Sequence, residues 1–560
     1  MSTTWLRSGR RSARIWLNAV VAMLLLTSLA CGAAPPSPAS KPAPACGGAA
    51  PTGGAGSGQA AGAPAKPADP ATKPAAPAAA APDAQQSLTV GLTQVTRNMD
   101  PKSTTAVNDY NQLRLVYDTL VSVDSGKPEP FLAESWSTSD PQTWRFKLRQ
   151  GVKFHNGEDF DAEAVRFTVQ RALDDAKNPW RARIEAIEKI TVIDKQTIEF
   201  ATKTPVANLP TRFSIVWIVP PKYAQEKGEA GLASAPVGTG PFIAKEYQPN
   251  VTMTLEANPN WWGGAPKIKT LKLRPIPEAS TRIAALQAGE VDVIYNVLPE
   301  QIDTLKNKGF QIISAPVAIS TNVFFQQVQD SPVKDARVRQ AIDFAIDKNA
   351  MLQSLTGGYG GVLEGQLVGK NSVGYNPNLK ARPYDPAKAK QLLAEAGHPN
   401  GFTITMDSPQ GRYYRDKDVA EAVQGFLSQV GIKVQLNPLQ AGVWLDKLYS
   451  GTWGPMNLWS IQDAPAYDLA FTMELFRKGN VRKIAADDKF DELHLKTFTT
   501  LDPAERDKAY RELSQYIFDQ AFIVPIYHEP GLYAASPKVR DVTFLPSTYM
   551  EVKKAYVAAQ

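Results

Sequence analysis

A compositional break near residue 84 separates a segment that cannot build a core from one that can. Between residues 32 and 84, 41 of the 53 residues are Ala, Pro or Gly. Such a segment cannot bury enough apolar surface to offset the entropy lost on ordering, so we expect it to be disordered. Residues 85–560 are long enough for several hydrophobic cores, because single cores stop growing near about 250–300 residues. We therefore expect the folded body to begin at residue 85.

The N-terminus has the pattern of a secretory signal. Four arginines between residues 7 and 14 precede an apolar run that ends at Cys31. The run is about 16 residues long, which is typical of a signal peptide and shorter than the roughly 20 residues of a membrane span. The residues before Cys31 resemble the lipobox of bacterial lipoproteins, in a loose form because Ser28 stands where an aliphatic residue is usual. These features predict a signal peptide at 1–30, a lipid on Cys31 and a tether over 31–84; cleavage without lipid is the alternative.

Charge and cysteine content exclude several functions for the body. The chain has a net charge of +6, but residues 1–84 hold seven Lys/Arg and only two Asp. The body is left with 54 basic and 53 acidic residues, so nothing in its charge indicates nucleic-acid binding. Both cysteines, Cys31 and Cys46, precede the body. We therefore expect no disulfide, thiol nucleophile or thiolate metal site there.

The periodicity of the body predicts an α/β fold. Residues 144–149 alternate apolar and basic side chains, as in a half-buried strand. At 419–430 an amphipathic helix ends before Gly431, and the alternating residues 432–436 predict that it leads into a strand. Further helices are expected from their caps and stops, over 161–173, 335–357 as one helix, 385–397, and from 502 onward.

The stretch 152–167 crowds His155 and four carboxylates around an Asn-Gly pair. Its order is strand, turn and a helix capped by Asp161, so the carboxylates have structural roles and we interpret the stretch as scaffold. The four histidines are scattered, and the sequence holds neither a phosphate loop nor a G-x-S-x-G motif. The chain is thus expected to be no enzyme, with no catalytic residues, metal or cofactor; a secreted hydrolase is the alternative.

Three tryptophans, Trp444, Trp453 and Trp459, fall in a polar region that contains Gly and Pro. Rigid rings in an expected loop suit the wall of a ligand site. Lobe packing is the competing interpretation for each of them. Trp261 and Trp262 are expected to be structural.

The order of several segments resembles one known family. The matching segments are LVYDTLVSVD (115–124), PFLAESW (130–136), WRFKLRQGVKFHNGEDFDAEAV (144–165), VGTGPF (237–242), NPNWWGGAP (258–266), IPEASTRIAALQAGEVDVI (276–294) and DARVRQAIDFAIDK (335–348). Together they resemble the family 5 extracellular solute-binding proteins of the dipeptide/oligopeptide-binding type, which serve ABC importers.

The resemblance implies a periplasmic-binding-protein-like α/β fold of type II, cluster C, with two hinged lobes and an inserted third lobe. The implied boundaries are lobe I at 85–122, 235–313 and 521–560, lobe II at 123–234 and lobe III at 314–520. A ligand that touches both hinged lobes would favour the closed form.

The same resemblance implies a monomeric, extracytoplasmic protein, anchored to the cell membrane by its lipid in the periplasm or on the outer face of the membrane. It would capture a small solute, with a peptide favoured, and deliver it to an ABC permease with its ATPase subunits. An oligosaccharide or another small solute is the alternative ligand. A signalling or chaperone lipoprotein is a further alternative.

The implied ligand contacts lie on both hinged lobes. The lobe I contacts are Thr104, Thr105, Ala106 and Val107, and a weaker candidate, Tyr359, belongs to lobe III. In peptide-binding relatives an acidic residue three positions after a tryptophan pairs with the peptide amino terminus. Here Trp459 is followed at that position by Gln462, and Asp463 comes next. Because a neutral amide cannot supply that charge, either Asp463 takes over or the ligand has no free amine there.

Overall fold

The computed structural model describes residues 85–104, 107–140, 142–176, 178, 180–462 and 467–559. The predicted signal peptide, Cys31 and the tether lie outside these residues, as do Thr105, Ala106 and Asp463, so those predictions stay open. Within the described part of the chain, no helix is long and apolar enough to cross a membrane.

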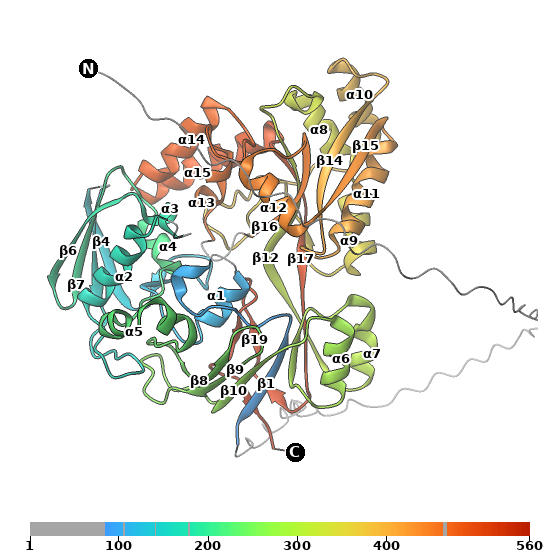
Figure 1. Ribbon diagram of the computed structural model, residues 1–560. Helices are drawn as coiled ribbons and strands as arrows, with labels where there is room; N and C mark the ends of the chain where they lie inside the picture. The colour runs from blue at the N-terminus through green and yellow to red at the C-terminus, as the bar shows by residue number, and fades with distance from the viewer. Residues whose placement is uncertain are drawn as a thin grey trace, which may run out of the picture. The chain divides into compact units, whose positions relative to one another are not determined.

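The main element is an 11-stranded sheet of mixed direction (Figure 1). Its parallel pairs include β1 with β10 and β14 with β15, whereas β12 is antiparallel to both of its neighbours. Along the sheet the strands are β15 (Ile432–Gln440), β14 (Phe402–Gln410), β16 (Met456–Gln462), β12 (Gln311–Phe325), β17 (Ile523–Ala535), β11 (Val293–Tyr295), β1 (Ser87–Leu92), β10 (Thr270–Pro275), β9 (Thr252–Ala257) and β8 (Phe242–Gln248), with β13 (Gly361–Val362) paired to β17.

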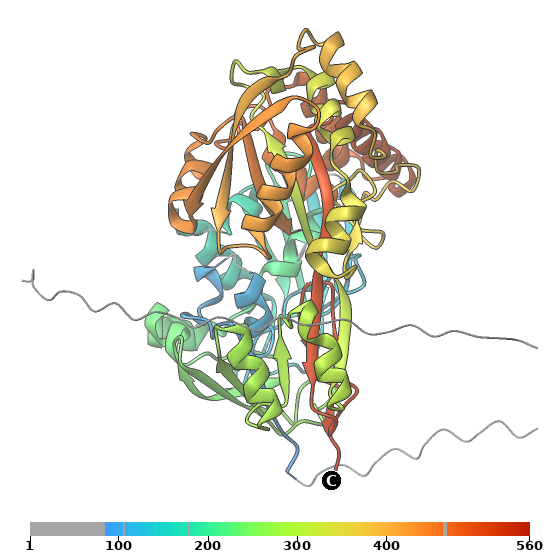
Figure 2. The same cartoon turned by 90° about the vertical axis from the view of Figure 1, so that its right-hand side faces the viewer.

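The long strands β12 and β17 connect the two halves of this sheet. They pair antiparallel from Gln311↔Ala535 to Phe324↔Ile523. Figures 1 and 2 show them running between the part that holds β14–β16 and the part that holds β1 and β8–β10. The register shifts between Pro316↔Pro530 and Ser320↔His528, so residues 317–319 of β12 face the single residue Glu529 of β17. Such an irregularity bends a strand and redirects side chains.

A second, antiparallel sheet is built wholly from residues 133–202. Its order is β4 (Ala133–Asp140), β5 (Thr143–Leu148), β7 (Thr197–Thr202) and β6 (Ile187–Asp194). In β5 the apolar side chains are buried and the basic ones exposed, which confirms the predicted strand. Helix α2 (Ala162–Asp174) begins where expected, because the Asp161 carboxylate accepts hydrogen bonds from the backbone N–H groups of Glu163 and Ala164.

One helix prediction is wrong in extent. Residues 335–357 form two helices, α8 (Ala336–Ala345) and α9 (Lys348–Thr356), because Ile346 is extended and Asp347 caps the second helix. Gly357, with φ of +63°, then ends α9 as expected. The other predicted helices are confirmed as α10 (Pro386–Glu395), α11 (Asp416–Ser428), which leads into β15, and α15 (Pro503–Asp519), which Asp502 caps.

The remaining elements are shorter or peripheral to the site. The helices are α1 (Val107–Leu113), α3 (Arg181–Ile184), α4 (Leu209–Arg212), α5 (Pro221–Ser234), α6 (Ala279–Gln287), α7 (Ile302–Asn307), α12 (Ala441–Ser450), α13 (Leu469–Met473) and α14 (Asp488–Thr499), with 3₁₀ turns at Pro101–Ser103, Phe213–Ile215, Pro299–Gln301, Pro332–Lys334 and Glu474–Phe476. Three two-stranded ladders pair β2 (Val121–Ser122) with β3 (Glu129–Pro130), β18 (Val539–Arg540) with β21 (Tyr556–Val557), and β19 (Thr543–Phe544) with β20 (Met550–Glu551).

The described residues cluster as one unit, and the mixed sheets with their helices confirm the α/β expectation. The second sheet lies inside the range predicted for lobe II. Strand β12 runs continuously across the predicted junction between lobes I and III at residues 313 and 314. The lobe boundaries themselves stay a prediction.

Candidate ligand-binding site

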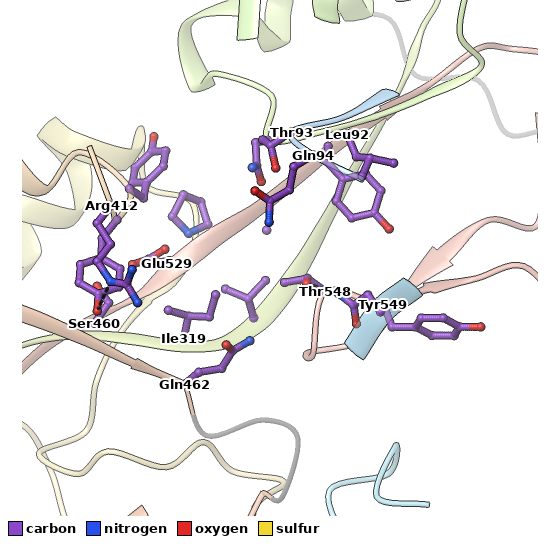
Figure 3. A pocket seen from close by; sticks show the side chains of 18 of the residues that line it. Leu92, Thr93, Gln94, Ile319, Arg412, Ser460, Gln462, Glu529, Thr548 and Tyr549 are labelled. Atoms are coloured by element: carbon purple, nitrogen blue, oxygen red, sulfur yellow. Dashed lines mark hydrogen bonds between the residues drawn. The ribbon is translucent and has the colours of Figure 1, made fainter. Parts of the chain in front are cut away.

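A cavity of about 990 Å³ lies where β12 and β17 cross between the two halves of the large sheet (Figure 3). This volume is in the range of small-molecule sites. Segments far apart in sequence contribute to its lining. They lie at 92–94 at the end of β1, 111–115 in and after α1, 295–298 at the end of β11, 411–414 after β14, 459–462 in β16, 529–533 in β17 and 548–550 before and in β20. Residues from both halves of the large sheet therefore face one space.

Glu529 is the acidic residue that lines this cavity. It is only 9% exposed, and its Oε1 accepts a hydrogen bond from Thr321 Oγ1 at 3.3 Å. Ser460 also hydrogen-bonds to the carboxylate, and Ser460 Oγ lies 3.0 Å from Thr321 Oγ1. Burial raises the pKa of Glu529 to about 7, an effect that the two hydroxyls only partly offset. Among the residues that the structure describes, Glu529 has no ion-pair partner.

Three arginines line the cavity, and they differ in their partners. Arg282 donates to the backbone carbonyls of Ile276, Pro277, Tyr295 and Asn296, so its guanidinium is committed to the fold. Arg183 lies over the ring of Phe471, 4.5 Å from its centroid. Arg412 lies over the ring of Tyr413, 5.3 Å from its centroid. Within the described ranges, neither Arg183 nor Arg412 forms an ion pair with a carboxylate.

The three tryptophans of the predicted ligand wall have different positions. Trp459 lines the cavity, and its ring packs against Phe324 at 4.8 Å and Trp444 at 6.3 Å between centroids. Trp444 and Trp453 are buried, and their indole N–H groups donate to Asn457 Oδ1 and Arg482 O. For these two rings the packing interpretation holds. The expected loop is correct only for Trp453, because Trp444 lies in α12 and Trp459 in β16.

Of the other predicted ligand contacts, some line the cavity and some do not. Gln462 lines the cavity, at the end of β16. Thr104 is outside the lining residues; its carbonyl accepts from Trp180 Nε1 and its hydroxyl donates to Asp109. Tyr359 is also outside them and packs against the apolar cluster of α6 and α7. The backbone of Val107 begins α1, whose later residues reach the cavity.

Sequence reasoning missed Glu529 and Arg412. One signal for Glu529 was available. The segment IVPIYHEPGLYAA is apolar except for His528 and Glu529, and a lone carboxylate within a buried strand needs a structural or functional partner. For Arg412 no such signal exists, because its segment becomes part of the cavity only when β14 and β16 pair.

The stretch around His155 is structural. Its Nε2–H donates to Gly240 O at 2.9 Å, while Nδ1 accepts from the backbone N–H of Gly238. Burial lowers the pKa of His155 to about 4, so the ring is neutral near neutral pH. These bonds join the turn to residues 238–240, and His155 is not among the residues that line the cavity. Nowhere in the described residues do three His, Cys, Asp or Glu gather as a metal site.

The chain is similar to known binding proteins along most of its length. Residues 127–482 match the family described as "Bacterial extracellular solute-binding proteins, family 5 Middle". The glutathione-binding protein GsiB of Escherichia coli (strain K12) is 30% identical over 452 residues, which cover 77% of this chain and 87% of GsiB.

Solved structures show the same fold. The periplasmic binding protein DppA of Helicobacter pylori, in complex with the peptide STSA, has a TM-score of 0.71 at 24% identity and covers 84% of this chain and 98% of its own. The substrate-binding protein CtaP of Listeria monocytogenes has a TM-score of 0.76 at 22% identity and covers 84% and 99%. The expected periplasmic-binding-protein-like fold is thereby confirmed. With its family match, its similarity to GsiB and a cavity between the halves of its large sheet, the chain belongs to the bacterial extracellular solute-binding proteins of family 5.

Proposed function

We propose that the protein captures a peptide-like solute in the 990 Å³ cavity and delivers it to the permease of an ABC importer. The observation that carries this proposal is the lining of the cavity, to which both halves of the large sheet contribute through segments that meet at β12 and β17. A ligand that touches both halves binds best when they are close together, so it shifts the population toward a closed form. The permease would select that loaded form.

The charges in the cavity favour a peptide over a sugar. Glu529 lines it without a described cationic partner, and Arg183 and Arg412 line it without a described carboxylate partner. A free peptide is a zwitterion and can neutralise both signs, whereas a neutral oligosaccharide would leave these charges unpaired. GsiB is named for glutathione and DppA was solved with a peptide, which supports the same ligand class.

The remaining parts of the proposal concern the setting. Cys31 would carry the lipid, residues 31–84 would act as the tether, and the body would work as a monomer at the extracytoplasmic side of the membrane. The predicted lobe boundaries, with lobe II at 123–234 as an insertion, would place the hinge between lobes I and III at residues 313/314 and 520/521. The work of the protein is binding and release, without a covalent step.

Calorimetric titration of the purified protein tests the ligand class. The panel contains short peptides, reduced glutathione and neutral oligosaccharides, and each mixture is analysed afterwards for products by mass spectrometry. We expect saturable binding of peptides at micromolar concentration or below, with each ligand recovered intact. Saturable binding of oligosaccharides alone would exclude the peptide proposal, and repeated turnover of any compound would favour the hydrolase.

A further inference from the structure

The position of Glu529 is unusual within the strand that carries it. The register shift of β12 against β17 leaves Glu529 facing residues 317–319, outside the regular ladder that resumes at Ser320↔His528. This irregularity allows Glu529 to line the cavity from within an otherwise apolar strand. Figure 3 shows its side chain on the same side of the cavity as Ser460 and Arg412.

The partners of Glu529 only partly satisfy a charged carboxylate. Hydroxyl groups of Thr321 and Ser460 are its hydrogen-bond donors among the described residues. Two hydroxyl donors cannot replace the hydrogen bonds that an ionised carboxylate accepts from water, which number up to about four. These hydroxyls also lie 3.0 Å from each other, so one can donate to the other instead. The group is therefore poised for an additional positive partner.

The surroundings suit a cation that comes from the cavity. Trp459, Tyr413 and Tyr414 line the same cavity, and aromatic faces attract cations electrostatically. Arg412, which Figure 3 shows on the same side of the cavity as Glu529, stacks on the rings of Tyr413 and Trp444 and donates its Nε–H to Tyr413 Oη. Its guanidinium is held in this aromatic contact and forms no ion pair with Glu529.

We propose that Glu529 is the specificity-determining carboxylate of the cavity and binds a primary ammonium group of the ligand. This inference rests on the proposed peptide-binding function and identifies the residue that selects among peptides. Gln462 stands where peptide-binding relatives have the acidic residue that pairs with the peptide amino terminus. The proposal answers which residue supplies the negative charge here: it comes from Glu529 in β17 and not from the end of β16. Because β17 belongs to both halves of the sheet, an ammonium bound there stands at the junction about which the halves would close.

The test measures dissociation constants for three matched probes: trialanine, N-acetyl-trialanine, and N-acetylated alanyl-lysyl-alanine. The first carries an α-ammonium, the second carries none, and the third carries a side-chain ammonium. The proteins are the wild type, Glu529→Gln, Glu529→Asp, and the charge-matched surface control Glu188→Gln, whose side chain is exposed on β6. Thermal unfolding of each protein verifies that it is folded.

We expect the wild type to bind at least one of the two ammonium probes at least tenfold more tightly than N-acetyl-trialanine. Glu529→Gln should reduce this preference to within about twofold, since it keeps the shape and removes the charge. Glu529→Asp should retain part of the preference, and Glu188→Gln should leave it unchanged. Which ammonium probe is preferred tells whether the peptide terminus or a basic side chain is recognised.

Two outcomes would overturn the inference and leave the peptide function standing: equal binding of all three probes by the wild type, or a preference that persists in folded Glu529→Gln. Failure of the wild type to bind any of the three probes would overturn the inference. The proposed function would fall with it only if the peptides and glutathione of the calorimetric panel also fail to bind, so the two failures are distinguishable.

Discussion

Two buried carboxylates, Asp118 and Glu529, show how differently similar burial can be used. Asp118 lies three residues before β2. Its Oδ2 accepts hydrogen bonds from Thr239 Oγ1 at 3.0 Å, Trp262 Nε1 at 2.8 Å and Trp261 Nε1 at 3.2 Å. Burial raises its pKa to about 6, against about 7 for Glu529. Both groups thus carry the cost of burial, yet only Glu529 lines the 990 Å³ cavity.

The difference lies in the donors. An indole N–H can only donate a hydrogen bond. Without the Asp118 carboxylate, both tryptophan N–H groups would lack this acceptor, and the carboxylate would lose two donors. The hydroxyls at Glu529 can donate elsewhere, and they do not require a charged acceptor. Burial and a raised pKa therefore do not identify a binding residue by themselves; the chemistry of the partners separates a structural carboxylate from one that a ligand can complete.

The largest expected effect is that of Asp118→Ala on stability. The substitution leaves three donors without their acceptor, so we expect a loss of about 3–5 kcal/mol in the free energy of unfolding. Asp118→Asn keeps an acceptor oxygen and should cost less. Urea unfolding of both variants measures this, and peptide affinity of the folded protein should be unchanged. A loss below about 1 kcal/mol for Asp118→Ala would mean that Asp118 is not the structural member of the pair.

Trp459→Ala tests whether the Trp459 ring contributes to ligand binding as well as to packing. Its ring both lines the cavity and packs on Phe324 and Trp444, so we expect a stability loss of up to about 3–4 kcal/mol together with at least tenfold weaker ligand binding. Trp453→Ala is the matched control, because Trp453 is fully buried outside the cavity lining and should lower stability alone. Unchanged affinity in folded Trp459→Ala would make this ring a packing residue like the other two.

Glu529→Gln should change stability in the opposite direction to Asp118→Ala. The carboxyl has an ordinary pKa of 4.5 and a raised folded pKa of about 7, so ionisation favours the unfolded chain as pH rises through this window. Without ligand, Glu529→Gln should therefore be more stable than the wild type by roughly 1–3 kcal/mol at pH 8, and the difference should shrink toward pH 4.5. Urea unfolding at four pH values measures it. A variant less stable than the wild type at pH 8 would show that the charge is satisfied within the fold.

Local rules predicted the elements of this protein better than its site. Asp161, Asp385 and Asp502 begin helices as expected, because a cap depends on the next three residues alone. The error at 335–357 has the same origin, since Asp347 is a second cap inside a continuous apolar pattern.

The cavity depends on contacts that no local pattern contains. The register shift opposite Glu529 arises when β12 pairs with β17 across some 200 residues of sequence. The burial of Trp444 arises when α12 packs on β14 and β15 and the indole N–H reaches Asn457 in β16. Family resemblance led to the correct fold and to Trp459 and Gln462 at the cavity, but it directed attention to the end of β16 for the missing charge. The sequence marked Glu529 only as a lone carboxylate in an apolar segment, and the pairing of β17 with β12 placed it at the cavity.

The smallest expected effect is the pH dependence of ammonium binding. Several ionisable groups face Glu529: Asp416 at the start of α11, Tyr413, Tyr414 and Arg412 in the segment before it, and Tyr527 beside it in β17. Burial raises the pKa of all three tyrosines, that of Tyr414 to about 12, so they stay neutral between pH 6 and pH 7. Burial lowers the pKa of the neighbouring His528, which favours its neutral ring.

Glu529 is then the group that titrates in this range, and its proton must leave before an ammonium can bind. Affinity for whichever ammonium probe binds more tightly should fall by roughly fivefold from pH 7 to pH 6, since the free protein is half protonated at pH 7 and mostly protonated at pH 6. Binding should release a proton, which titrations in buffers of different ionisation enthalpy detect. Glu529→Gln should show a flat profile and no proton release. A flat profile in the wild type would place the ammonium elsewhere and return Glu529 to the same structural class as Asp118.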